Sequence, residues 1–164
     1  MWNIYSPRTN HDAYAKRMLQ LIHPFYKEGI MGINPMAAYK RSLQDKNSAI
    51  GFIFPSNKSH SPVNALGFIY LIKRRQKGLI SKVEPPFYQI KQILISKDNQ
   101  NKGMGTALLK WGLKQMDAHP VVAQVMPTNK SAIMFYKKRH FKCVETLYCG
   151  KNKDRKELLF ARYL

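Results

Sequence analysis

Acidic residues are scarce in this sequence: its 164 residues include 9 Asp and Glu against 28 Lys and Arg, a formal net charge of +19. A field of that sign favours polyanions as partners, such as nucleic acid, an acidic membrane or an anionic cofactor. Lys outnumbers Arg, and the charges are spread along the chain. We therefore interpret most of them as a solvated surface and keep nucleic-acid binding as an open alternative.

Cysteine is also rare, and Cys143 and Cys149 show neither metal-ligand spacing nor a disulfide framework. The five histidines form no HxxxH pair, so a structural zinc is not expected. No apolar run approaches the ~20 residues of a membrane span. The first residues lack the charged and apolar regions of a signal peptide. We expect a cytoplasmic protein with reduced thiols, no metal and no membrane partner.

The sequence does contain enough apolar material for a core. Hydrophobic residues make up 45% and aromatic residues 12%, which excludes a disordered chain. No repeat or linker divides the sequence, so residues 1–164 are expected to form a single domain.

Apolar periodicity predicts the order β-α-α-β-β-β-α-β-α-β-β, a mixed α/β domain. The expected strands cover residues 2–5, 49–54, 65–72, 87–95, 121–125, 141–148 and 158–163. The expected helices cover residues 11–26, 34–43, 106–117 and 129–139. Pro24 leaves an earlier end of the first helix open, and Asn129 or Thr128 is expected to cap the last one.

Two glycines, Gly103 and Gly105, lie between the fourth expected strand and the helix after it. Such a loop turns backbone N–H groups outward at the positive end of a helix, which suits a phosphate. A plain turn and helix cap is the alternative reading of so short a motif.

This loop, at this place in the element order, resembles the GNAT superfamily of acetyl-CoA-dependent N-acetyltransferases. The family motif Arg/Gln-x-x-Gly-x-Gly/Ala is matched by Gln100, Gly103 and Gly105. The resemblance covers about residues 49–164 and, weakly, the N-terminal helices. It implies a mixed, mostly antiparallel central sheet of six to seven strands, flanked by about four helices and splayed between the fourth and fifth strands.

A second match lies downstream. Asn129, Ala132 and Tyr136, followed by Phe141, resemble the family element Asn-x-x-Ala-x-x-x-Tyr…Gly-Phe. Asn129 and Tyr136 are seven residues apart and so share a helical face. In the mechanism that the resemblance implies, an amine attacks the thioester directly and Tyr136 protonates the departing thiolate as general acid.

The resemblance also implies how acetyl-CoA, the co-substrate, is held. Backbone amides of residues 101–106 cradle its pyrophosphate, and unpaired backbone groups of the splayed fourth strand bind its pantetheine. An N–H of Ile93 or Ile95 stabilises the oxyanion. The implied cofactor-binding residues are Ile93, Leu94, Ile95, Gln100, Asn101, Lys102, Gly103, Met104, Gly105, Thr106 and Asn129.

Two residues depart from the family pattern. Gln92 occupies a position on the fourth strand that is acidic in many relatives, and an amide cannot accept a proton, so the general base is unassigned. His140 replaces the glycine that usually precedes Phe141, and we interpret it as a left-handed helix-capping variant.

The predicted function is N-acetylation of a primary amine of a small molecule or peptide. The first alternative is an RNA-linked amine such as aminoacyl-tRNA, on which GNAT-type toxins act; it rests on the +19 charge and the basic segments 73–82 and 151–156. The second is a non-catalytic cofactor-binding module. Candidate residues for the acceptor groove are Tyr26, Tyr39, Tyr70 and Tyr88. A monomer and a homodimer both remain open.

Overall fold

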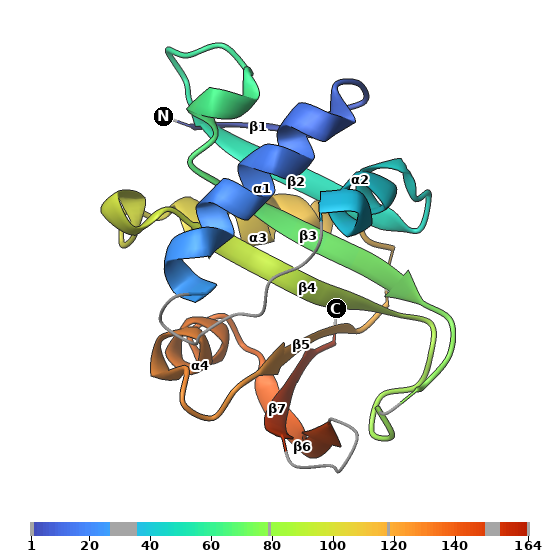
Figure 1. Cartoon of the computed structure of the whole chain (residues 1–164). Coiled ribbons are helices and arrows are strands. Elements are labelled where there is room, and N and C mark those ends of the chain that lie inside the picture. Colours follow the sequence, from blue (N-terminus) through green and yellow to red (C-terminus); the bar gives the residue numbers. More distant parts are fainter. Residues whose placement is uncertain (1, 27–35, 79, 118, 150–154, 164) are drawn as a thin grey trace. The chain divides into compact units, whose positions relative to one another are not determined.

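The structure, a computed structural model, describes residues 2–26, 36–78, 80–117, 119–149 and 155–163. These residues contain seven strands and four α-helices (Figure 1). The strands are β1 (Trp2–Tyr5), β2 (Ser48–Pro55), β3 (Gly67–Arg74), β4 (Phe87–Ile95), β5 (Val121–Val125), β6 (Lys142–Cys149) and β7 (Arg155–Arg162). The helices are α1 (His11–Tyr26), α2 (Met36–Gln44), α3 (Met104–Lys114) and α4 (Lys130–Lys137), with short 3-10 turns η1 (Pro62–Asn64) and η2 (Lys97–Asn99).

The strands form one mixed sheet in the order β1-β2-β3-β4-β5-β7-β6. The predicted order of elements is confirmed, and the bounds of β4 and β5 agree with the expectation. The bounds of α1 also agree with the expectation, so the helix continues past Pro24. The largest differences are at β7, which begins three residues earlier than expected, and at α3, which begins two residues earlier and ends three residues earlier. Most other ends differ by one or two residues. The expected start of the second helix at residues 34–35 lies outside the described residues.

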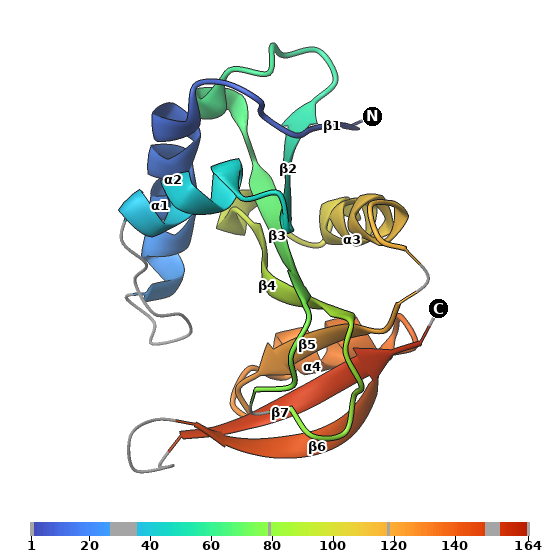
Figure 2. The ribbon, with the colours of Figure 1, turned by 90° about the vertical axis from the view of Figure 1, so that its right-hand side faces the viewer.

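By its contacts the chain divides into two compact units, and the first comprises residues 1–71 and 92–116. In this unit α1 and α2 cover one face of the strands and α3 covers the other (Figure 2). The two faces follow from strand alternation in β2. Phe52 and Phe54 join the core beneath α1 and α2, whereas Gly51 lies against the ring of Trp111 in α3.

Glycines let this unit pack closely in two places. A Cβ on Gly51 would lie 2.6 Å from Trp111, and a Cβ on Gly67 would overlap the carbonyl oxygen of Leu94. The second approach brings β3 against the end of β4, the strand that leads into the glycine loop.

The second unit comprises residues 72–91 and 117–164. Here β5 pairs antiparallel with β7, and β7 pairs antiparallel with β6. One face of these strands carries an apolar cluster that the loop between β3 and β4 covers with Ile80 and Val83. The other face carries Phe160, which stacks on Tyr136 of α4.

The pair β4–β5 is parallel, and its register runs from Tyr88 opposite Val121 to Ile90 opposite Ala123. These are residues of the N-terminal half of β4. The parallel pair matches the splayed strands that the family resemblance implies, so the predicted fold class is confirmed.

Among the described residues, no helix is long and apolar enough to cross a membrane. In the same part of the chain, no group of three or more His, Cys, Asp and Glu side chains is arranged to hold a metal ion.

Candidate functional site

The glycine loop between β4 and α3 has two residues in the left-handed region. Gly103, the N-cap of α3, has φ 84°, and Asn101 has φ 59°. A Cβ on Gly103 would meet no atom within 4 Å, so the backbone conformation and not a lack of room calls for glycine there. Turns of this kind direct successive N–H groups into a shared concavity that accepts anions.

The chemistry of the loop fits a phosphate. Residues Gln100, Asn101, Lys102 and Gly103 are all exposed, while the side chain of Met104 is 1% exposed and anchors the start of α3 in the core. The first turn of this helix has no acidic residue and no side-chain cap. No carboxylate in the first turn of α3 therefore offsets the positive end of the helix dipole.

Two side chains tie the loop to the turn before it. The amide nitrogen of Gln100 donates to the carbonyl of Ile95 at 3.1 Å, and Lys102 Nζ donates to the carbonyl of Asp98 at 2.8 Å. Both contacts hold the loop from within the protein. The backbone carbonyl of Ile95 thus already accepts one hydrogen bond from within the protein, and its contact with a cofactor stays a prediction.

The other backbone groups of Ile93–Ile95 also stay predicted cofactor ligands. The side chains of Leu94 and Ile95 are buried, and Leu94 belongs to the core that α1 and α2 cover. Their side chains are thus structural, which leaves any binding role to the main chain.

Gln92 lies on the same strand, at the position that the family resemblance led us to expect as acidic. The hydroxyl of Tyr39, on α2, donates to Gln92 Oε1 at 2.6 Å. The side chain of Tyr39 is 2% exposed. Gln92 is thus held as a neutral hydrogen-bond acceptor, and an amide is not a base at neutral pH.

The other predicted groove tyrosines have internal partners. Ser42 Oγ donates to the hydroxyl of Tyr70 at 2.7 Å, and the hydroxyl of Tyr88 donates to the Asp117 carboxylate at 3.4 Å. The side chain of Tyr26 lies outside the described residues.

Asn129 begins α4 as its N-cap. Its Oδ1 accepts a hydrogen bond from the N–H of Ala132 at 3.0 Å, so the predicted cap is confirmed at Asn129 and not at Thr128. The oxygen of this side chain is therefore committed to the helix, and the contact with a cofactor predicted for Asn129 falls to its amide nitrogen or backbone.

Tyr136, on the same helix, packs against aromatic residues from outside the helix. Its side chain is 5% exposed, and its ring centroid lies 5.2 Å from that of Phe141 and 6.2 Å from that of Phe160. Burial raises the pKa of the phenol well above its usual value. Tyr136 is consequently neutral at physiological pH and retains its proton.

The end of α4 fixes the Tyr136 side chain. The N–H of Phe141 donates to the carbonyl of Tyr136 at 3.2 Å, and the N–H of His140 donates to the carbonyl of Lys137 at 3.1 Å. This is a Schellman motif, in which the residue after the helix is left-handed and the next one packs back on the last turn. His140 has φ 63°, as predicted, and the Phe141 ring packs on Tyr136.

Arg139 completes this helix end. Its guanidinium lies 3.8 Å from the centroid of the Phe135 ring and donates to the Phe135 carbonyl at 2.8 Å. These contacts stabilise the aromatic pair Phe135–Tyr136, whose rings meet edge to face.

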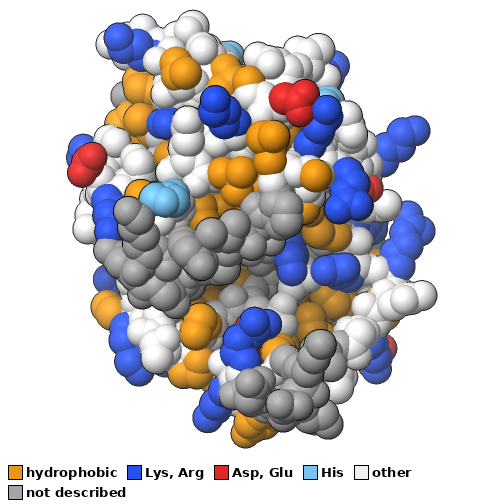
Figure 3. All heavy atoms as spheres, viewed as in Figure 1, with side chains coloured by type: hydrophobic (Ala, Val, Ile, Leu, Met, Phe, Trp, Pro, Cys, Tyr) orange, Lys and Arg blue, Asp and Glu red, His pale blue; other side chains and the backbone are white. Residues whose placement is uncertain are grey.

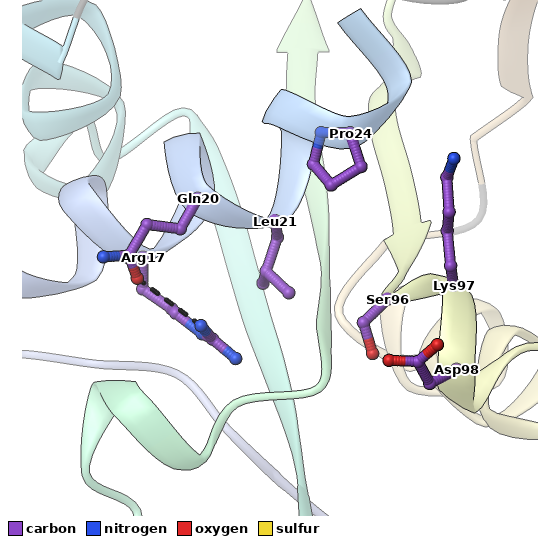
Figure 4. Close-up of a pocket in the computed structure, with 7 residues that line it drawn as sticks. All are labelled: Arg17, Gln20, Leu21, Pro24, Ser96, Lys97 and Asp98. Carbon is purple, nitrogen blue, oxygen red and sulfur yellow. Dashed lines mark hydrogen bonds between the residues drawn. The ribbon is translucent and has the colours of Figure 1, made fainter. Parts of the chain in front are cut away.

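A pocket of about 300 Å³ lies in the first unit, beside the turn that precedes the glycine loop (Figure 4). Its lining consists of Arg17, Gln20, Leu21, Pro24, Ser96, Lys97 and Asp98. None of the predicted site residues is among them. Two nitrogens of Arg17 donate to the carbonyl of Ala65, at 2.6 and 3.1 Å, so this cation is engaged in joining α1 to the loop before β3.

Sequence reasoning missed a polar network in the second unit. Arg74 Nε donates to Gln89 Oε1 at 3.0 Å, and Gln89 Nε2 donates to Gln124 Oε1. A signal was present: Gln89 follows the buried Phe87 by two residues and so lies on the same face of the strand. The hydrogen bond between Tyr39 and Gln92 had no such local signal, because the two residues are 53 positions apart.

Three comparisons bear on the identity of the chain. The model of the acetyltransferase (GNAT) family matches residues 16–141. No curated protein matches the sequence.

Solved structures with the same fold are numerous. The crystal structure of Arabidopsis thaliana NAA60 with a bisubstrate analogue has a TM-score of 0.77 at 15% identity, covering 99% of this chain and 98% of that one. NAA60 with acetyl-CoA gives 0.73 at 16% identity, covering 100% and 98%. The ribosomal-protein-S18-alanine N-acetyltransferase of Escherichia coli gives 0.68 at 16% identity, covering 99% and 94%. At these levels of sequence identity, the similarity shows a shared fold alone.

Proposed function

Because this chain belongs to the GNAT acetyltransferase family, we propose that it transfers the acetyl group of acetyl-CoA to a primary amine of a small molecule or peptide. The observation that carries the proposal is the exposed, left-handed loop around Gly103 at the start of α3, where no side chain caps the helix. Related folds support it: NAA60 is known in complex with acetyl-CoA, and the Escherichia coli relative is an N-acetyltransferase of an alanine.

In this proposal the chain holds acetyl-CoA mainly through its backbone. The N–H groups of residues 101–106 bind the pyrophosphate, with the helix dipole of α3 adding to the attraction. Main-chain groups of Ile93–Ile95 bind the pantetheine together with Asn129. When bound, the co-substrate supplies an activated acetyl thioester.

The chain's own residues then manage charge and protons. The amine nitrogen bonds to the acetyl carbon while the bond from that carbon to sulfur breaks. An N–H of Ile93 or Ile95 stabilises the negative charge on the carbonyl oxygen. Tyr136, which burial keeps neutral, gives a proton to the leaving sulfur.

The amine must lose a proton in the same reaction, and Gln92 cannot take it. We propose that the amine arrives neutral, that its nitrogen passes one proton to water after the attack, and that a proton from water restores the Tyr136 hydroxyl. The hydrogen bond from Tyr39 then gives Gln92 a positioning role, with its amide oriented by α2.

The test combines binding with turnover. Acetyl-CoA at 100 times its Kd stabilises the folded protein by about 2.7 kcal/mol, which is a rise in Tm of roughly 5–10 °C for a chain of this size. Acetyl-CoA consumption is then screened over polyamines, aminoglycosides, amino acids, peptides and charged tRNA. No rise in Tm at millimolar acetyl-CoA would exclude the proposal. A rise without transfer to any amine would instead favour a non-catalytic module.

The +19 charge supports a second candidate, an RNA-linked amine as acceptor. On the face in Figure 3, Lys and Arg side chains visibly outnumber Asp and Glu. Each phosphate contact adds roughly −0.7 to the slope of log K against log salt for a single strand. RNA binding that weakens steeply between 50 and 200 mM salt, together with acetylation of charged tRNA, would favour this candidate over the first.

A further inference from the structure

A row of polar side chains crosses three neighbouring strands of the second unit. Arg74 on β3 donates to Gln89 on β4, which in turn donates to Gln124 on β5. Gln89 is 5% exposed and is the one polar side chain classed as buried among the residues that the structure describes. An apolar residue at that position would avoid the cost of desolvating an amide, so the row departs from ordinary core composition.

The row lies where the apolar face of this unit ends. Phe87 and Val122 belong to the apolar cluster, and Gln89 and Gln124 follow them by two residues on β4 and β5. Gln89 is paired with Val122, one position before the last recorded parallel pair, Ile90 with Ala123. The amide–amide hydrogen bond thus joins β4 to β5 next to the end of their pairing.

Charged groups border this row, and most are positive. Lys91 follows Gln89 by two residues. Its pKa is lowered by desolvation and then by the positive charge of Arg74, while the carboxylate of Glu157 acts in the opposite direction. That carboxylate is shared, because Arg155 Nε lies 2.9 Å from Glu157 Oε1. The one carboxylate that opposes the charges of Arg74 and Lys91 is therefore already paired with another cation.

We propose that Arg74 and Lys91 select acceptors that carry an anionic group, a carboxylate or a phosphate, close to the reacting amine. The inference rests on the proposed function, in which the donor binds at the splay of β4 from β5. The Gln89 amide accepts a hydrogen bond from Arg74 Nε and is itself held by Gln124. The guanidinium keeps a fixed plane, and its terminal nitrogens form the edge that binds a carboxylate or phosphate in a paired fashion.

A purely structural role makes a different prediction. If the row only ties β4 to β5, the Gln89–Gln124 hydrogen bond is essential and the charge of Lys91 is irrelevant to the choice of acceptor. If the row recognises an anion, reversing that charge changes which acceptor is preferred.

The experiment measures kcat/KM for matched acceptors with acetyl-CoA saturating. One pair is the dipeptide amides Ala-Glu and Ala-Gln, with Ala-Lys as the cationic counterpart; the other is O-phosphoethanolamine and ethanolamine. The wild-type protein is expected to prefer the anionic member by tenfold or more. The preference falls to threefold or less in Lys91→Gln and reverses toward Ala-Lys in Lys91→Glu. Arg74→Lys keeps the charge and loses the planar fork, so an intermediate preference is expected.

Arg75→Gln is the matched control, because Arg75 is the exposed neighbour of Arg74 and lies outside the row. It should keep the wild-type ratio. Equal kcat/KM for both members of both pairs, or an unchanged preference in Lys91→Glu, would overturn the inference and leave the proposed function intact. A preference in one pair alone assigns the anion as carboxylate or phosphate. Failure to acetylate any amine would refute the proposed function, and the inference with it.

Discussion

Tyr136 combines two properties that usually conflict, since it is a buried aromatic residue of the packing and the proposed proton donor. Its ring packs against Phe141 and Phe160, and its backbone carbonyl accepts the Schellman hydrogen bond from Phe141. The side chain is therefore preorganised by the same contacts that stabilise the end of α4. Preorganisation of this kind is what a proton donor needs to act without reorganising the site.

Replacing Tyr136 by Phe removes the hydroxyl and keeps the ring. We expect kcat to fall by about 10²-fold, the lower range for loss of a general acid, while the Kd for acetyl-CoA changes little. Stopped-flow or steady-state assays with isothermal titration would measure both. Tyr148→Phe, at a side chain that is 56% exposed, is the control and should keep the wild-type rate. An unchanged kcat in Tyr136→Phe would remove Tyr136 from the role of acid.

The raised pKa of Tyr136 predicts a pH dependence of stability. A phenol whose pKa is higher in the folded state ionises first in the unfolded chain, so the stability that it contributes is present below about pH 10 and is lost as pH rises further. Urea unfolding at pH 8, 9.5 and 10.5 should show the wild type losing stability relative to Tyr136→Phe only at the highest pH. If the difference in the free energy of unfolding between the wild type and Tyr136→Phe already changed between pH 8 and 9.5, this would contradict a raised pKa of Tyr136 in the folded state.

His140 provides a stability prediction that does not involve catalysis. Its φ of 63° costs a residue with a Cβ roughly 1–2 kcal/mol, and glycine avoids most of that cost but loses more entropy on folding. We expect His140→Gly to stabilise the protein by about 0.5–1 kcal/mol, a rise in Tm of roughly 1–4 °C. His23→Gly, inside α1, is the opposite control and should lower Tm. A lower Tm for His140→Gly would refute the capping role.

At the scale of elements, the glycine loop and α3 depend on each other for their conformation. The left-handed Gly103 begins the helix, while Gln100 and Lys102 fasten the loop to the turn after β4. The direction of the N–H groups depends on this backbone conformation, so a change at Gly103 acts on the whole loop.

Gly103→Ala tests that dependence. The added methyl group has room, but φ 84° is unfavourable for alanine, so the loop must either bear the strain of roughly 1–2 kcal/mol or change conformation. We expect the Kd for acetyl-CoA to rise by about tenfold, equivalent to ~1.4 kcal/mol. Gly78→Ala is a matched control, because Gly78 has φ 57° and equally open space. It should lose similar stability and keep the wild-type Kd; equal loss of affinity in both variants would argue against a specific role of the loop.

At the scale of the whole molecule, the chain forms two compact units, yet β3 and β4 each contribute residues to both. Two strands shared between units make independent unfolding costly, because either unit would lose part of its own sheet. For this reason we propose that the two units belong to a single domain.

The proposal predicts one cooperative transition. Thermal unfolding followed by circular dichroism and by Trp111 fluorescence should give coincident curves, and calorimetric and van't Hoff enthalpies should agree. Trp2 and Trp111 both belong to the first unit, so their fluorescence reports on that unit. Unfolding of the second unit is followed through the far-ultraviolet circular dichroism. Two separated transitions would show that the units are independent domains.

Much of the candidate site could be predicted from local sequence because the chemistry involved is local. The turn at Gly103, the cap at Asn129 and the left-handed His140 each depend on hydrogen bonds that span a few residues. The pattern of apolar residues likewise predicted the bounds of β4 and β5, because a strand and the prolines before it are recognised from consecutive residues. The order of the elements followed from these local signals.

The tertiary structure decided which of these residues meet and which are already engaged. It placed the hydroxyl of Tyr39 on Gln92, gave the Ile95 carbonyl a partner in Gln100, and buried Gln89 between Arg74 and Gln124. No local rule predicts these contacts between separate elements, since they depend on strand order, register and the packing of α2. The sequence by itself therefore indicated the loop proposed to bind the donor, whereas the row proposed to select the acceptor became visible only in the folded chain.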